Sequence, residues 1–433
     1  MVASTDIKFY VHTNNNAPQL QNAYGSMIGV LDACLINGIN IGTVSSLAAS
    51  GTTVTALFSS AHNLMQYQVI KITGANQSEF NGEHRILTVP NAQSITFELA
   101  AAPSTTAATG TIEASLPPLG WEKPLSSVNA NGGGKAAYRS MNLLLPSRPF
   151  LRVVDELDPA YTASYAKYAK VGIIEDMTDI DTMLGVQAPY DVANPDKNWV
   201  GSGSGDSCFN GWSKWVYARS ATAIDHTQDS QNPSNGERAW VLLGNSDFFY
   251  ILPANSPNFS ILLMYGFGAF STTINTDSSN TFLMASTYYG SASVGRFMCV
   301  HTPGTSSQAN NLEAPVLIQR KYNQNGVYAC AHTQSLQLSS LTTVYSGGVD
   351  YINSAFVANS VPFAPVILME AESTSDASIS MIRGGLPNLN WLFQRKPYPN
   401  LSKHIDSNVV YLAVDVALRS ANQGQVLFSL GRL

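Results

Sequence analysis

The chain has 433 residues, a length that favours two or three domains over one. Its hydrophobic fraction of 45% is enough to build cores, which excludes a wholly disordered chain. Only 12% of the residues are charged, against about 25% in an ordinary soluble domain, and neutral polar residues take their place. Such a composition suits a surface that is largely covered by neighbouring subunits.

The charge pattern and the apolar segments exclude several classes of partner. The net charge is −6 and no basic run is longer than Arg395-Lys396, so nucleic acid is not expected to bind. The first twelve residues lack the pattern of a signal peptide, and the most apolar stretches, 261–270 and 409–418, are too short to cross a bilayer. We therefore expect a soluble protein without membrane insertion.

The four cysteines are far apart and fit neither a CxxC nor a zinc pattern. They are Cys34, Cys208, Cys299 and Cys330. Buried free thiols are expected, which is consistent with assembly in a reducing cytoplasm.

In chain order, the first predicted element is a short helix with one buried face. Its apolar residues recur at helical spacing: Met27, Ile28, Val30, Leu31, Cys34 and Leu35. Asn37-Gly38 supplies a stop signal at its end.

A compact β-module is predicted over residues 42–115. Five strands are expected, at 53–58, 66–73, 84–89, 94–99 and 109–113. Their spacing of about ten residues is typical of a small sandwich or barrel. Gly82 suits a position with positive φ. Pro117-Pro118 bounds the module at one end and Gly38 with Gly42 at the other, so residues 1–41 are assigned to the main domain and 42–115 to an insertion.

Residues 116–433 are predicted to form a larger β-rich main domain. Strands are expected at 150–154, 170–175, 239–243, 248–252, 260–264, 365–370 and 409–418, with polar loops at 201–207 and 228–237. A division near residue 300 would give two subdomains. The predicted fold class is mainly β, with sandwich or barrel-like domains and a few short helices.

No arrangement of residues predicts an enzyme, a metal site or a cofactor. The seven histidines are scattered, and the acidic run Glu175, Asp176, Asp179, Asp181 lacks the glycine and distal glutamate of an EF-hand. Gly201-Ser202-Gly203-Ser204-Gly205 has glycine where a nucleophile elbow needs serine, so a loop is the better interpretation.

Several aromatic residues lie in or beside predicted loops. Those considered for surface contact are Trp212, Trp215, Tyr288 and Tyr289. Exposed, they could stack on sugars or anchor a protein interface. The alternative, favoured for any single one of them, is that they close over the edges of the core.

Ordered segments along the chain resemble a family of tailed-bacteriophage virion structural proteins. The segment 72–82, with 86–89, Phe97 and 107–110, is similar to a small β-module found in phage tail-associated proteins. The flanking segments similar to the family are 120–124, 137–139, 151–153, 177–182, 238–242, 247–250, 265–268 and 383–387. The family pattern favours glycine where this chain has Asn388, and it usually lacks the inserted module.

The resemblance implies a structural part of a virion, assembled in the host cytoplasm, with no catalytic residues to carry over. It favours a tail, baseplate or tail-tip protein that packs symmetrically with its own copies and with other tail or baseplate proteins, and that supports host attachment. It also implies core positions for Trp121, Trp240 and Phe248-Phe249, and a tight turn at Arg383-Gly384-Gly385. The alternatives are a carbohydrate-binding adhesion protein that contacts host surface glycan and, less favoured, a glycan-degrading enzyme, which needs two carboxylates about 5–10 Å apart.

Overall fold

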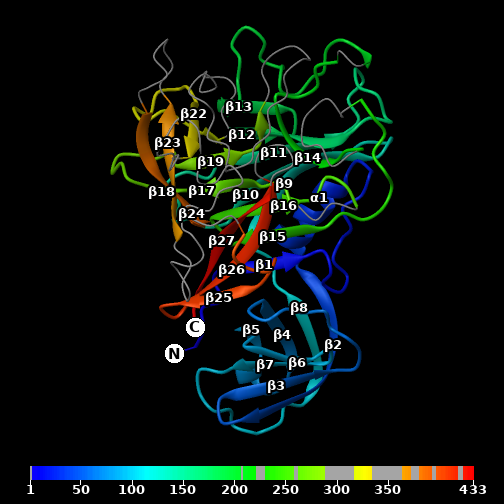
Figure 1. Ribbon diagram of the computed structural model, residues 1–433, viewed down its shortest axis with the longest axis vertical. Coiled ribbons are helices and arrows are strands. Elements are labelled where there is room, and N and C mark those ends of the chain that lie inside the picture. Colours follow the sequence, from blue (N-terminus) through cyan, green and yellow to red (C-terminus); the bar gives the residue numbers. More distant parts are fainter. Residues whose placement is uncertain are drawn as a thin grey trace.

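The computed structural model describes residues 2–205, 208–220, 230–257, 262–287, 316–333, 363–371, 380–392, 396–417 and 423–433. The predicted fold class is confirmed: the chain is mainly β, built from antiparallel sheets with few helical turns. The molecule is elongated, with a small body of strands β2–β8 at one end and a larger body at the other (Figure 1).

The predicted N-terminal helix is present and ends where the sequence indicates. Helix α1 (Ser26–Leu31) continues as a π-helical turn, η1 (Asp32–Asn37), and stops at Gly38, whose φ is 76°. Its buried residues are Met27, Val30, Leu31, Cys34 and Leu35. This apolar face packs on strands β10 (Gly133–Ser140) and β11 (Phe150–Glu156).

The small body is a closed barrel. Its strands are β2 (Ile39–Ser50), β3 (Thr53–Phe58), β4 (Val69–Ala75), β5 (Gly82–Arg85), β6 (Thr88–Asn91), β7 (Ser94–Glu98) and β8 (Gly110–Leu116), with a 3-10 turn η2 (Ser78–Phe80). They pair in the order β5-β4-β8-β2-β3-β7-β6. Only Ile86 and Leu87 separate β5 from β6, and their N–H groups donate to the carbonyls of Gln68 and Thr96 at 2.9 and 2.8 Å. The continuous segment 82–91 thus forms both ends of the sheet, pairing with β4 in its first half and with β7 in its second half, which closes the sheet into a barrel.

The barrel follows the predicted module closely but differs in two strands. The predicted strand 84–89 is two strands that meet at the closing corner, and β2 was not predicted as a strand. The interior is apolar, with Val54, Ile72, Ile86, Ile95 and Phe97 all fully buried, and Gly82 has the positive φ expected, 124°. Leu57 is 44% exposed, because side chains alternate along β3 and Leu57 is on the outer face.

The larger body contains two sheets. The first has the order β20-β14-β12-β11-β10-β9, with β13 paired to β12. Its remaining strands are β9 (Trp121–Val128), β12 (Lys167–Asp179), β13 (Thr182–Ala188), β14 (Ser213–Ala218) and β20 (Ser286–Thr287).

The second sheet of the larger body is 13-stranded and runs β1-β15-β16-β17-β19-β21-β22-β23-β24-β27-β26-β25, with β18 paired to β24. Its early strands are β1 (Lys8–Val11), β15 (Trp240–Gly244), β16 (Phe248–Pro253), β17 (Tyr265–Ala269), β18 (Ser271–Thr272) and β19 (Thr281–Met284). Its late strands are β21 (Val316–Ile318), β22 (Ala329–Thr333), β23 (Phe363–Ala371), β24 (Ser380–Leu392), β25 (Lys403–Asp406), β26 (Val409–Ala417) and β27 (Gln423–Arg432).

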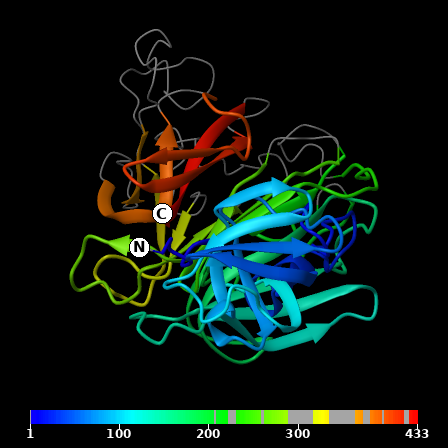
Figure 2. The same cartoon turned by 90° about the horizontal axis from the view of Figure 1, so that it is seen from below.

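The large sheet curls so that early and late strands face each other. Tyr250 on β16 lies 5.3 Å from the ring of Phe428 on β27, and Leu262 forms a bridge with Val416. In the view from below, the late strands occupy the side of the body away from β9 and β10 (Figure 2). Aromatic residues fill the core, and the core positions implied by the resemblance for Trp121, Trp240, Phe248 and Phe249 are present, none being more than 4% exposed.

Three sequence interpretations of the larger body differ from the structure. Strands on both sides of residue 300, which itself lies outside the described residues, pair directly as β19 with β21 and belong to one sheet, so no division between sheets falls there. Of the predicted strand 260–264, residues 260 and 261 lie outside the described residues, and 262–264 precede β17, which begins at Tyr265. Arg383-Gly384-Gly385 is not a turn but the middle of β24. There β18 pairs with β24 so closely that a Cβ on Gly384 would lie 2.0 Å from the Ser271 carbonyl oxygen.

The barrel is fixed to the larger body by polar side chains at its base. Arg85 donates to the carbonyl oxygens of Ser4, Tyr67 and Leu430 at 2.7, 2.7 and 2.8 Å. Gln68 bonds the Phe9 carbonyl at 3.0 Å and the Asn14 side chain at 2.9 Å. The N-terminal segment, the barrel and the last strand therefore meet at one point.

Asp155 attaches the helix to the first sheet of the larger body. Its carboxylate accepts hydrogen bonds from the N–H groups of Met27 and Ile28 at 3.1 and 3.4 Å and from the Tyr217 hydroxyl at 2.6 Å. The side chain is fully buried, and burial raises the pKa of Asp155 to about 6.

We predict that the isolated fragment 39–116 folds on its own. The barrel closes on itself and has its own apolar interior, so it needs the larger body only for attachment. Circular dichroism with urea should show β-structure and one cooperative transition. A fragment without a transition would mean that the barrel depends on the larger body to fold.

We predict that Asp155→Asn changes how stability depends on pH. The unfolded pKa is 3.8 and the folded pKa about 6, so the folded state holds the proton more tightly. This contribution, about 3 kcal/mol, is complete below pH 3.8 and is lost as pH rises through about 6. Because asparagine does not ionise, the unfolding free energy of the variant relative to wild type should rise by about 2–3 kcal/mol between pH 4 and pH 7.5. Urea titrations at both pH values measure it, and parallel curves for the two proteins would contradict it.

Candidate functional site

Of the four aromatic residues considered for surface contact, the structure describes Trp212 and Trp215, and both are buried. Trp212 and Trp215 are 1% and 0% exposed. Trp215 donates its indole N–H to the Met284 carbonyl at 2.8 Å and stacks on Tyr265, so it ties the two sheets of the larger body together. Both tryptophans therefore lie in the core, the position favoured from the sequence, whereas Tyr288 and Tyr289 lie outside the described residues.

The acidic run on β12 and the turn that follows it is divided among separate ion pairs. Glu175 pairs with Arg320, while Asp181 accepts from Lys135 at 2.7 Å and from Arg152 at 2.5 Å. The part of the chain that the structure describes contains no group of three His, Cys, Asp or Glu side chains placed to hold a metal.

The described histidines serve local packing. His84 stacks on Phe97 with ring centroids 4.3 Å apart, and His62 accepts the Leu64 N–H at 2.9 Å. Burial lowers the pKa of both imidazoles, so they are neutral near pH 7. Cys34 and Cys330 are buried free thiols, as predicted, and Cys208 is a half-buried free thiol.

Two buried ion pairs have structural roles. Lys170 lies 2.8 Å from Asp158, both 4% exposed, and Asp158 also accepts the N–H groups of Ala160 and Gly201. On β24, Arg383 pairs with Asp277 at 2.6 Å and with Glu370. Their charges are satisfied inside the protein, which leaves them unsuited to a substrate. No helix among the described residues is long and apolar enough to cross a membrane.

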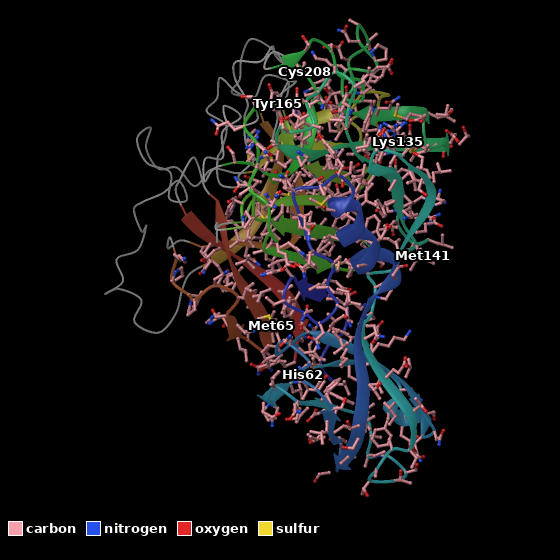
Figure 3. All side chains as sticks on the ribbon, turned by 90° about the vertical axis from the view of Figure 1, so that its right-hand side faces the viewer. His62, Met65, Lys135, Met141, Tyr165 and Cys208 are labelled. Atoms are coloured by element: carbon pink, nitrogen blue, oxygen red, sulfur yellow. The ribbon has the colours of Figure 1, made fainter. Side chains whose placement is uncertain are left out.

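The feature that packing does not explain is an apolar loop between β10 and β11. Met141, Leu143 and Leu144 are 58%, 77% and 92% exposed. Met141 lies on the outer side of the larger body, just above the point where the chain runs down into the barrel (Figure 3). We call residues 141–146 the apolar loop.

The apolar loop is held in one conformation by hydrogen bonds at its base. The Asn142 side chain accepts the Leu144 N–H at 3.0 Å and donates to Asp247 at 2.8 Å. Met141 N–H bonds the Gly120 carbonyl at 3.2 Å, and Arg148 bonds the Ser140 carbonyl at 2.8 Å. A fixed loop that displays leucines loses little entropy on binding, so it suits a protein contact.

Sequence reasoning missed this loop. The run Leu143-Leu144-Leu145 would ordinarily predict a buried segment, because leucine is among the most buried residue types. The available signals were Asn142 before the run and Pro146 after it, which favour a loop. Neither indicates whether the leucines face the core or the solvent.

The comparisons with known proteins do not identify a function for this chain. No family model and no curated protein matches it. Among solved structures, the chain is similar to the phage phi92 endosialidase, with 11% identity over 89% of this chain and 69% of that chain and a TM-score of 0.16. A TM-score of this size does not indicate a shared fold.

We predict that metal chelation leaves the stability unchanged. In the acidic run, Glu175 and Asp181 are paired with arginine and lysine, and Asp176 and Asp179 accept backbone N–H groups. The described imidazoles are held by packing and backbone contacts. Thermal unfolding with and without EDTA should give the same midpoint, with an added-calcium sample as control. A drop of several degrees in EDTA would reveal a stabilising ion.

Proposed function

We propose that this chain is a structural subunit of a tailed-phage virion, in the tail, baseplate or tail tip. It joins copies of itself and neighbouring virion proteins, assembles in the host cytoplasm and supports host attachment. The ordered segments that resemble phage virion proteins support the choice of particle.

The observation that carries the assembly role is the rigid, exposed apolar loop on a chain with few charges. An exposed apolar patch on an otherwise well-packed protein is typical of a contact site. With 12% charged residues, repulsion between copies is weak. The barrel, fixed at one end of the body by Arg85 and Gln68, would stand clear of contacts made by the larger body.

The alternatives have less support from the described residues. A carbohydrate-binding surface would need exposed aromatic platforms, and Trp212 and Trp215 are in the core. A glycan-degrading enzyme would need a pair of free carboxylates. The acidic residues Glu175, Asp158 and Asp181 are each paired with a cation.

We predict that the purified chain self-associates at modest concentration and hydrolyses no glycan. Subunit surfaces without strong charge lack the repulsion that keeps a monomer apart. Sedimentation velocity across a concentration series should show species larger than the 46.4 kDa monomer. A stable monomer at all concentrations would contradict the assembly role, and release of reducing sugar from host glycan would contradict the absence of enzyme activity.

A further inference from the structure

The surface around the apolar loop carries both an unpaired cation and an unpaired anion. Arg148 makes one side-chain hydrogen bond, to the Ser140 carbonyl, and has no carboxylate partner among the described residues. Asp247 accepts the Asn142 amide and the Ser246 hydroxyl, both at Oδ1, and has no cation partner in the same part of the chain. Both side chains are half-buried and both hold the base of the loop.

This pattern matches that of a protein interface. Three large apolar side chains are exposed on the loop, and two charged groups without an ionic partner lie at its base. The largest apolar patch on an ordinary monomer is roughly 300–600 Å², whereas a stable interface buries roughly 800 Å² on each partner. The loop can therefore supply only part of the area of a stable contact, and the surface around the loop has to supply the remaining area.

The rim charges decide which partner fits. A foreign protein would have to offer an anion for Arg148 and a cation for Asp247 in the right places. A second copy of this chain, related by a twofold axis, offers both charges from the same surface. In such a contact Arg148 of each copy can face Asp247 of the other copy.

We infer that the apolar loop, with Arg148 and Asp247, is a self-complementary surface that pairs two copies of the chain about a twofold axis. Met141, Leu143 and Leu144 of each copy form the shared apolar centre. Arg148 of each copy pairs with the carboxylate of Asp247 on the other. This contact rests on the proposed assembly role and names the partner of that surface.

Charge reversal tests the pairing with a built-in rescue. Arg148→Glu alone and Asp247→Arg alone each place like charges across the axis, so each should weaken dimerisation about tenfold or more in sedimentation velocity. The double variant Arg148→Glu/Asp247→Arg restores opposite charges between copies and should recover dimerisation. Thermal unfolding of each variant checks that the loop's base survives, because Asp247 also holds Asn142.

The apolar centre is tested separately. Leu143→Ser/Leu144→Ser should weaken dimerisation about a hundredfold. Val192→Ser is the matched control, since Val192 is 84% exposed on another loop and should leave dimerisation unchanged.

The outcomes separate this contact from the assembly role. Single charge variants that weaken dimerisation, without recovery in the double variant, would overturn the reciprocal pairing. Self-association that none of these variants affects, or that Val192→Ser weakens equally, would overturn the contact and leave the assembly role standing. A wild-type chain that stays monomeric would overturn both.

Discussion

The attachment of the barrel to the larger body depends on the Arg85 guanidinium. Arg85 is the last residue of β5, next to the corner where one segment closes the barrel, and it is 3% exposed. Its bonds to the carbonyls of Ser4, Tyr67 and Leu430 hold the N-terminal segment, the barrel and the last strand at once. The chain enters the barrel through β2 and leaves through β8, which are paired, so that stem alone would allow the barrel to pivot. Because three carbonyls, two of them in buried hydrogen bonds, would lose this donor if Arg85 moved away, the bonds favour one orientation of the barrel on the body.

Local sequence patterns were sufficient to predict those elements whose structure follows from their own residues. Strand β3 has the bounds predicted, because its apolar and polar residues alternate without interruption. Strands β15 and β16 are buried on both faces and appear as apolar runs, and their predicted ends differ by one residue. The missed strand β2 contains small and polar residues with a bulge at Gly42, and it is a strand because β3 and β8 pair with it on either side. Arg383-Gly384-Gly385 resembled a turn, but it lies in β24, and Gly384 is needed where β18 pairs closely with that strand.

The candidate site could not be predicted because it depends on which face of an element finds a partner. Trp215 lies near a glycine-rich loop in the sequence, yet β14 is a strand of the first sheet and its Trp215 bonds the Met284 carbonyl of the second sheet, inside the core. The leucines of the apolar loop are instead exposed, because Asn142 bonds both Asp247 and the Leu144 N–H and so holds the loop outside the core. Asn388 shows the same dependence on a smaller scale. It stands where the family pattern favours glycine, and its φ of 56° is one that asparagine adopts more readily than most side chains.

The scarcity of charge has a stronger effect on the surface than the composition suggests, because much of the charge lies inside. The chain has 23 basic residues, and Arg85, Arg152, Lys167, Lys170, Arg238 and Arg383 are all buried. Arg238 is held by backbone carbonyls, and burial lowers its pKa to about 10. Arg383 and Lys170 pair with the carboxylates of Asp277 and Asp158, which are therefore buried as well. Because fewer charges remain at the surface, the exposed leucines of the apolar loop, with Arg148 and Asp247 beside them, can have a large effect on how two copies meet.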